Sequence, residues 1–363
     1  MTLTLTLPGR VPATPEPDPA SDVAVPRPRR PRGRLVLLLG VLAVLLAASV
    51  GPPRSGPFTT VPGRDAAAEV RLERLPVPDP GHPGALAHRG GPRVPVRPAA
   101  IAPALEHPED WVPFPAPQEC RVADPGPPLL VCGEETPWPP VRRIVVVGDS
   151  HAQQYSGALD ALAAERHWQV VRMLRGACPF STASETAPGS PGCIAWNAAA
   201  RAQILALRPD LVVTTATRDV RIGPTETTPP GFVRAWRELD AAGIRVLAIR
   251  DNPRYDRSPV DCVRHEGAGA AGCAVPRDLL LSPVAPYRRL PDVPPNVTFF
   301  DPSDHLCTPT TCPPVVGNVL VNFDANHLSA TFTRTLGPVL SEQLEPLLAA
   351  PAARPDAPRG IGR

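Results

Sequence analysis

Short apolar runs alternate with longer amphipathic stretches from Val141 onward. Runs rich in β-branched residues predict strands at residues 144–147, 169–173, 211–215, 245–249 and 297–300. Helices are predicted at residues 152–166, 194–207, 231–242 and 329–348. This alternation is typical of an α/β protein whose parallel sheet is covered by helices. Residues 251–295 are long and rich in proline, so we interpret them as an insertion.

The N-terminal third of the chain lacks this alternation. Residues 1–33 are rich in proline and arginine, which predicts a disordered cytoplasmic tail. Residues 34–51 are apolar and follow an arginine cluster, which predicts a single-pass transmembrane helix. The arginines should stay in the cytoplasm, so the C-terminal part of the chain should lie on the other side of the membrane. The alternative is a cleaved signal peptide and a secreted protein. We predict a Pro-rich linker over residues 52–117, a catalytic domain over 118–348 and a disordered tail over 349–363.

Charge and composition narrow the classes of function. The 363-residue chain has a formal net charge of +2, which argues against a nucleic-acid partner because such proteins carry a concentrated basic surface. The chain contains no lysine, which excludes chemistry that depends on a lysine amine. We expect no cofactor and no metal.

Eight cysteines occur as near neighbours in the sequence. Exported domains tolerate disulfides, and a preference for short loops favours a sequential pairing among many connectivities. The pairs so predicted are Cys120–Cys132, Cys178–Cys193, Cys262–Cys273 and Cys307–Cys312. A zinc site at Cys307 and Cys312, with His305 nearby, is the alternative, although no second cysteine pair lies close to it.

Two short polar motifs carry the candidate chemistry, GDSH at 148–151 and DANH at 324–327. A serine becomes a nucleophile when a base takes its proton, and the base needs an anion to orient it. Ser150, His327 and Asp324 can fill these three roles. Ser150 follows a buried strand, which places it at the edge of an α/β sheet where ligands bind. The spacing of Asp324 and His327 would turn both side chains to one side at the start of a helix.

Simpler roles exist for several of these residues. Ser150 could be a turn residue that caps the next helix. Asp149 and His151 flank the serine, and adjacent residues cannot easily turn toward their neighbour's hydroxyl, so we predict that they hold the turn by hydrogen bonds. Trp111 and the other tryptophans could stack on sugar rings, but apolar packing is the commoner use of this residue.

The chain resembles the SGNH hydrolases, and more closely the extracytoplasmic SGNH domain fused to acyltransferase-3 membrane proteins that O-acylate bacterial surface glycans. The matching stretches are VVVGDSHAQQY at 145–155, ACPF at 177–180, CIAW at 193–196, RPDLVV at 208–213, DNP at 251–253, the pair Cys262 and Cys273, CTPTTCPPVVGN at 307–318 and DANHLS at 324–329. The resemblance runs from about Gly84 to Leu348. It implies a flavodoxin-like, three-layer parallel sheet, with Ser150 as nucleophile, His327 as general base and Asp324 as the orienting carboxylate.

The same resemblance implies an oxyanion hole, in which Ser150 and Gly176 would donate. Other members add an asparagine after the third strand, but the loop at residues 214–219 contains none. Arg218, or Thr217, is the substitute donor that we expect. One such donor can be worth about 10²- to 10³-fold in rate.

By resemblance, the protein is a membrane-anchored serine O-acyltransferase or esterase that acts on acyl groups of cell-envelope glycans. Its partners would be an acylated glycan or acyl donor. The multi-pass acyltransferase-3 domain is missing from this sequence, so transfer would require a separate multi-pass membrane acyltransferase. The alternative is a catalytically weak glycan-binding module that keeps the fold, which the missing asparagine favours.

Overall fold

The computed structural model describes residues 80–88, 95, 97, 101, 110–123, 129–219, 223–269 and 271–349. The predicted cytoplasmic tail (1–33), the predicted membrane helix (34–51) and residues 350–363 lie outside these ranges. Within the described ranges, no helix combines the length and the apolar character that a membrane crossing requires.

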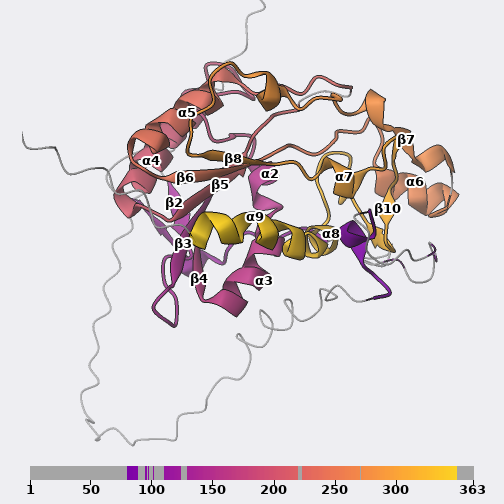
Figure 1. Ribbon diagram of the computed structural model, residues 1–363, viewed down its shortest axis with the longest axis horizontal. Coiled ribbons are helices and arrows are strands. Elements are labelled where there is room, and N and C mark those ends of the chain that lie inside the picture. The colour runs from indigo at the N-terminus through magenta and orange to yellow at the C-terminus, as the bar shows by residue number, and fades with distance from the viewer. Residues whose placement is uncertain are drawn as a thin grey trace, which may run out of the picture. The chain divides into compact units, whose positions relative to one another are not determined.

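A seven-stranded sheet with the order β1-β2-β4-β3-β5-β6-β8 forms the centre of the domain (Figure 1). Its parallel strands are β3 (Arg142–Gly148), β4 (Trp168–Leu174), β5 (Leu211–Thr215), β6 (Arg245–Ile249) and β8 (Val297–Phe300). They include all five predicted strands. In chain order, these five strands are arranged as 2-1-3-4-5, the order found in flavodoxin. The prediction of an α/β fold with a mostly parallel sheet is confirmed.

Helices cover both faces of this sheet, as Figure 1 shows. One face packs against α3 (Ser156–Arg166), α8 (Ala330–Thr335) and α9 (Gly337–Ala349). The other face packs against α4 (Pro191–Leu207) and α5 (Pro230–Ala241). Side chains alternate across a strand, so Ile144 and Val146 enter the first core, while Val145 and Val147 enter the second. The apolar run before the GDSH motif is continuous because both of its faces are buried.

Two predicted helices are each split in the structure. The prediction at 152–166 corresponds to α2 (Ser150–Gln153) and α3, and the prediction at 329–348 corresponds to α8 and α9. The second interruption falls at Leu336, just before Gly337 and Pro338. Proline has no N–H to continue the hydrogen-bond ladder and restricts the residue before it, which accounts for the break.

Parts of the predicted linker belong to the folded domain. Residues Gly84–His88 form the 3₁₀ helix η1, where the backbone N–H of Ala85 donates to Thr335 Oγ1 at 2.9 Å. The Asp110 carboxylate accepts hydrogen bonds from the backbone N–H and the hydroxyl of Thr331 at 3.0–3.2 Å. These contacts lie before the predicted boundary at residue 118, and sequence periodicity did not indicate them because they are hydrogen bonds of single residues.

The remaining elements are short. They are η3 (Pro117–Glu119), β1 (Cys120–Val122), β2 (Leu130–Cys132), α6 (Pro259–Glu266), η4 (Ala271–Cys273), β7 (Val275–Pro276), η5 (Arg277–Leu279), η6 (Pro286–Arg289), α7 (Ser303–Leu306), β9 (Thr311–Cys312), β10 (Val315–Val316) and β11 (Val319–Leu320). Strands β1 and β2 extend the sheet in antiparallel fashion beside β4.

All four disulfides of the sequential pairing are present. They join Cys120 to Cys132, Cys178 to Cys193, Cys262 to Cys273 and Cys307 to Cys312. The alternative of a zinc site at the last pair is wrong, since both of its sulfur atoms are bonded to each other. The Cys178–Cys193 bridge attaches the loop after β4 to α4, next to the site described below.

Candidate active site

Ser150 is the first residue of α2, at the carboxyl end of the central strand β3. The turn before it needs a glycine, because Gly148 has a φ of +144° and a Cβ at this position would lie 3.0 Å from that of Ala152. Asp149 caps α2, since its Oδ1 accepts a hydrogen bond from the backbone N–H of His151 at 3.0 Å. The turn-holding role predicted for Asp149 corresponds to this contact.

The structure brings together the three residues that the motifs suggested. His327 Nε2 lies 2.9 Å from Ser150 Oγ, and His327 Nδ1 lies 2.9 Å from Asp324 Oδ2. The other carboxylate oxygen of Asp324 accepts the backbone N–H groups of Asn326 at 2.6 Å and His327 at 2.7 Å. One carboxylate thus shapes the loop and orients the imidazole.

The local conformation differs from the one that we predicted for this pair. Asp324 and His327 lie in a bend before α8, which begins at Ala330, and not at the start of a helix. Hydrogen bonds from an aspartate to backbone N–H groups further along the chain favour such a turn. Burial alone would raise the pKa of Asp324, but the hydrogen bonds from His327 and from the two backbone N–H groups lower it overall. The carboxylate is therefore charged at neutral pH.

A buried amide pair, missed from sequence, ties the two halves of this site together. Gln154 Oε1 accepts the backbone N–H of Leu328 at 2.9 Å, and Gln154 Nε2 donates to Asn252 Oδ1 at 2.8 Å. Asn252 Nδ2 in turn donates to the backbone carbonyl of Asn326 at 2.8 Å. The loop that carries His327 is therefore fixed to the helix that carries Ser150. Gln154 and Asn252 both lie in matching stretches, at 145–155 and 251–253, but sequence analysis gave neither of them a role.

The segment around Trp111, inside the predicted linker, also contacts the site. The Trp111 ring packs edge-on against the His327 ring with centroids 4.7 Å apart. The next residue, Val112, accepts a hydrogen bond on its carbonyl from Gln153 Nε2 at 2.9 Å. Trp111 thus packs on the imidazole, and its backbone neighbour holds α2.

A second histidine–aspartate pair lies beside the first. His151 Nδ1 is 2.6 Å from Asp251 Oδ1, and both side chains are only 4% exposed. The rings of His151 and His327 lie 5.0 Å apart between centroids. His151 was expected to hold the turn, but its side chain instead joins the loop after β6, which sequence reasoning did not foresee.

The hydrogen bonds of this second pair define its protonation in the observed arrangement. Arg254 Nη2 lies 3.0 Å from His151 Nε2, and a guanidinium only donates, so Nε2 accepts and Nδ1–H donates to Asp251. Burial lowers the pKa of His151, but the charge and hydrogen bond of Asp251 outweigh burial and raise it overall. Burial likewise opposes the charged form of Asp251, yet His151 and the backbone N–H of Asp219 lower the pKa of this carboxyl.

A cavity of about 710 Å³ opens onto these groups. The lining residues that bear on the chemistry are Ser150, Ala177, Arg218, Arg254, Asn326 and His327. Gly176, our predicted donor after the second strand, is exposed and does not line the cavity, whereas Ala177 does, with a φ of +55°. Arg218, the predicted substitute donor, also lines the cavity. Burial lowers the pKa of Arg218, and the nearby Glu185 carboxylate opposes that shift.

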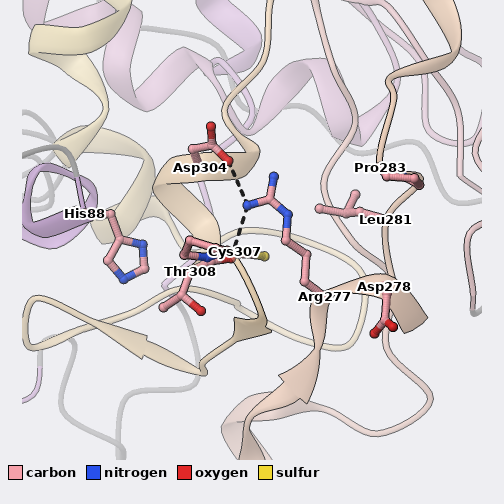
Figure 2. Close-up of a pocket in the computed structure, with 9 residues that line it drawn as sticks. His88, Arg277, Asp278, Leu281, Pro283, Asp304, Cys307 and Thr308 are labelled. Atoms are coloured by element: carbon pink, nitrogen blue, oxygen red, sulfur yellow. Dashed lines mark hydrogen bonds and ion pairs between the residues drawn. The ribbon is translucent and has the colours of Figure 1, made fainter.

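Figure 2 shows a different cavity, of about 580 Å³, around Arg277 and His88. Arg277 Nη1 forms an ion pair with Asp304 at 2.7 Å and donates to the Thr308 carbonyl at 3.1 Å. The sulfur of Cys307 is held in a disulfide, and the Thr308 hydroxyl donates to Thr311. Among the residues that line this cavity, none is an activated nucleophile.

The fold and the site define the chain as an α/β protein with serine, histidine and aspartate aligned at the carboxyl edge of a parallel sheet. A family model described as SGNH domain (fused to AT3 domains) matches residues 107–342, and the chain belongs to this family. The resemblance inferred from the motifs is thereby confirmed, and AT3 domains link the family to acyl transfer.

Other comparisons give less. The periplasmic domain of a lipopolysaccharide acetyltransferase from Salmonella ser. Paratyphi A is similar at 16% identity and a TM-score of 0.44, over 56% of this chain and 84% of that one. No curated protein sequence matches the chain significantly.

Proposed function

We propose that this protein is an extracytoplasmic serine acyl-ester enzyme that acts on acyl groups of cell-envelope glycans. The observation that carries the proposal is the continuous line of contacts from Ser150 Oγ through His327 to Asp324, each 2.9 Å long. In an oriented chain of this kind, the base is within reach of the hydroxyl proton. Family membership supports the acyl chemistry.

In the first half of the reaction, Ser150 Oγ attacks the carbonyl carbon of an ester. His327 Nε2 takes the hydroxyl proton, and the Asp324 carboxylate stabilises the imidazolium that forms. The tetrahedral intermediate then collapses, the alcohol leaves with the proton from His327, and an acyl-serine remains. In the second half, His327 deprotonates the acceptor, which is a glycan hydroxyl in transfer or water in hydrolysis.

The location outside the cytoplasm is supported by the four disulfides, which persist in oxidising compartments. In this proposal, residues 34–51 anchor the domain in the cell membrane as a single helix, with release after signal cleavage as the alternative. A separate multi-pass membrane acyltransferase supplies the acyl group if the reaction is transfer. The family's fusion to AT3 domains supports a partner of this kind.

Covalent labelling tests the proposal directly. A fluorophosphonate should label the wild-type protein and fail to label Ser150→Ala. Ser190→Ala is a matched control, because Ser190 precedes α4 and its hydroxyl caps no backbone group there. Release of aryl alcohol from an aryl acetate should follow the same order. Addition of an acceptor polysaccharide then separates transfer, which acetylates the glycan, from hydrolysis, which releases acetate.

A non-catalytic glycan-binding module is the second candidate. The observation that favours it is the missing asparagine in the loop at residues 214–219. Folded wild-type protein that resists the fluorophosphonate and still binds polysaccharide would establish this second function and refute the first.

A further inference from the structure

The proposed reaction creates a negative charge that the site must stabilise. When Ser150 attacks, the carbonyl oxygen of the ester becomes an oxyanion, and donors placed around it lower the barrier. The backbone N–H of Ser150 is one candidate, because N–H groups in the first turn of a helix lack intrahelical acceptors. A side-chain donor is also needed, and the loop after β5 contains no asparagine that could supply it.

Three polar side chains near the serine are already committed. The Thr217 hydroxyl donates to Glu226 Oε1 at 2.6 Å and accepts the backbone N–H of Asp251. The Asn252 amide N–H₂ donates to the backbone carbonyl of Asn326. The Asn326 amide nitrogen lies 3.3 Å from His327 Nε2, which is the side of proton transfer. The donors of Thr217 and Asn252 are thus engaged elsewhere, and the Asn326 amide lies beside His327 Nε2.

Arg254 has the properties that the other three lack. Its Nη2 donates to His151 Nε2 at 3.0 Å, which holds the guanidinium beside the residue that follows Ser150. Its Nε is buried and has no hydrogen-bond partner in the described part of the chain. A guanidinium carries five N–H donors, so several remain for a ligand, and Arg254 lines the cavity together with Ser150.

Position in the sheet supports the same choice. Arg254 lies in the loop after β6, and β6 pairs directly with β5, whose loop would carry the asparagine. Neighbouring strands lie about 4.8 Å apart, a distance that a long arginine side chain spans. Arg218, the donor expected from sequence, lines the same cavity beside Glu185, but no side-chain hydrogen bond anchors its guanidinium within the described residues.

We propose that Arg254 is the side-chain donor to the oxyanion and that the buried pair of His151 and Asp251 holds it in place. This inference rests on the proposed function. When the Ser150 oxygen bonds to the carbonyl carbon, the π electrons of the carbonyl move to its oxygen. The Arg254 N–H groups then donate hydrogen bonds to this oxyanion and stabilise its negative charge. The charge returns to the carbonyl when the alcohol leaves, so Arg254 exchanges no proton and needs no further reactant.

Steady-state kinetics with an aryl acetate test the proposal. We expect Arg254→Gln to lower kcat by about 10²- to 10³-fold with KM changed less than threefold, as for loss of an oxyanion donor. Arg254→Lys should recover part of the loss because it restores a cation, and added guanidinium should restore part of the activity of a small-side-chain variant such as Arg254→Ala. Arg257→Gln is the matched control, an exposed arginine in the same loop whose loss should leave kcat unchanged.

Several outcomes would overturn the assignment. Folded Arg254→Gln, checked by circular dichroism and thermal unfolding, that keeps kcat within threefold of wild type removes Arg254 from the oxyanion hole. A loss confined to KM would make Arg254 a substrate-binding group instead. If Arg218→Gln loses the 10²-fold or more and Arg254→Gln does not, the donor is Arg218.

The labelling experiment separates this inference from the proposed function. Wild-type protein that reacts with a fluorophosphonate at Ser150, together with Arg254→Gln that reacts equally fast, refutes the role of Arg254 and leaves the enzyme intact. Wild-type protein that does not react at all overturns the enzyme and the role of Arg254 with it.

Discussion

The two histidine–aspartate pairs of this site have the same chemical groups and opposite surroundings. His327 and Asp324 are partly exposed, with 19% and 41% of their side chains accessible, and the imidazole contacts a hydroxyl. His151 and Asp251 are almost fully buried, and the imidazole contacts a guanidinium. The group that contacts the second nitrogen of each imidazole therefore determines what that histidine can do. A hydroxyl gives the histidine a proton to remove, whereas a guanidinium leaves it none.

Burial sharpens this contrast. An imidazole that cycles between neutral and charged forms needs a partner carboxylate and access to substrate, which the first pair has. A buried, hydrogen-bonded pair is costly to disturb, because loss of the imidazole removes the Nδ1–H donor from the buried Asp251 carboxylate. The first pair is thus suited to catalysis and the second to holding structure.

The largest effect is expected from breaking the exposed pair. Substitution of His327 by alanine removes the base, and turnover of an aryl ester should fall by up to about 10⁶-fold, as in other serine sites. Stability to urea should change by less than about 1 kcal/mol because the side chain is partly exposed. A variant that keeps more than about 1% of wild-type turnover would contradict the assignment of the base.

Breaking the buried pair should chiefly affect stability. In His151→Ala, the buried Asp251 carboxylate loses its closest hydrogen-bond donor, so the free energy of unfolding should drop by about 3 kcal/mol. Urea denaturation at pH 7 measures the loss. His265→Ala is the control, because His265 is an exposed residue of α6. A drop below about 1 kcal/mol would show that the buried pair does not hold the site.

A further carboxyl group, that of Asp219, lies next to the buried pair, and its pKa makes the stability of the protein depend on pH. Asp219, whose backbone N–H donates to Asp251 Oδ2 at 3.0 Å, has a buried side chain, and burial raises its pKa from 3.8 to about 6. A raised pKa means that the folded state binds the proton more tightly than the unfolded state. Stability from this group is therefore present below pH 4 and lost as the pH rises to about 6.

Asp219→Asn should remove that dependence. The variant should be more stable than wild type by about 3 kcal/mol at pH 7.5, which is the free energy of a shift from 3.8 to about 6, and equally stable near pH 4. Urea denaturation at both pH values measures the difference. Equal stability of the two proteins at pH 7.5 would show that the carboxyl is not destabilised by burial.

The smallest effect is expected at the aromatic neighbour of the exposed pair. Trp111→Ala removes the edge-on contact with His327, and such contacts contribute about 0.5–1.5 kcal/mol. We expect kcat to fall about two- to tenfold. Trp111→Phe should retain most of the activity. Loss of binding to polysaccharide with unchanged kcat on a small ester would instead assign Trp111 to sugar stacking.

The parallel sheet could be predicted from sequence because its strands are buried on both faces, so their runs of β-branched residues are continuous. The proximity of the serine, histidine and aspartate could be predicted from sequence because each belongs to a short motif with defined chemistry. Arg254 was not predicted, and Asp251, although it belongs to the matching stretch DNP at 251–253, was given no role. Both residues lie in an irregular loop where no periodicity applies, and their roles depend on a contact with His151. The surroundings of Gly176 could not be predicted for a related reason: in the turn after β4, the following residue, Ala177, lines the cavity and Gly176 does not.

The short stretch from Asp110 to Val112 sets a practical limit on how the domain can be produced. It caps α8 through Thr331, packs on His327 and accepts a hydrogen bond from Gln153. A recombinant fragment cut at the end of the proline-rich composition would discard all three contacts, although every motif residue would still be present. Expression trials should therefore start upstream of η1, at or before Pro80.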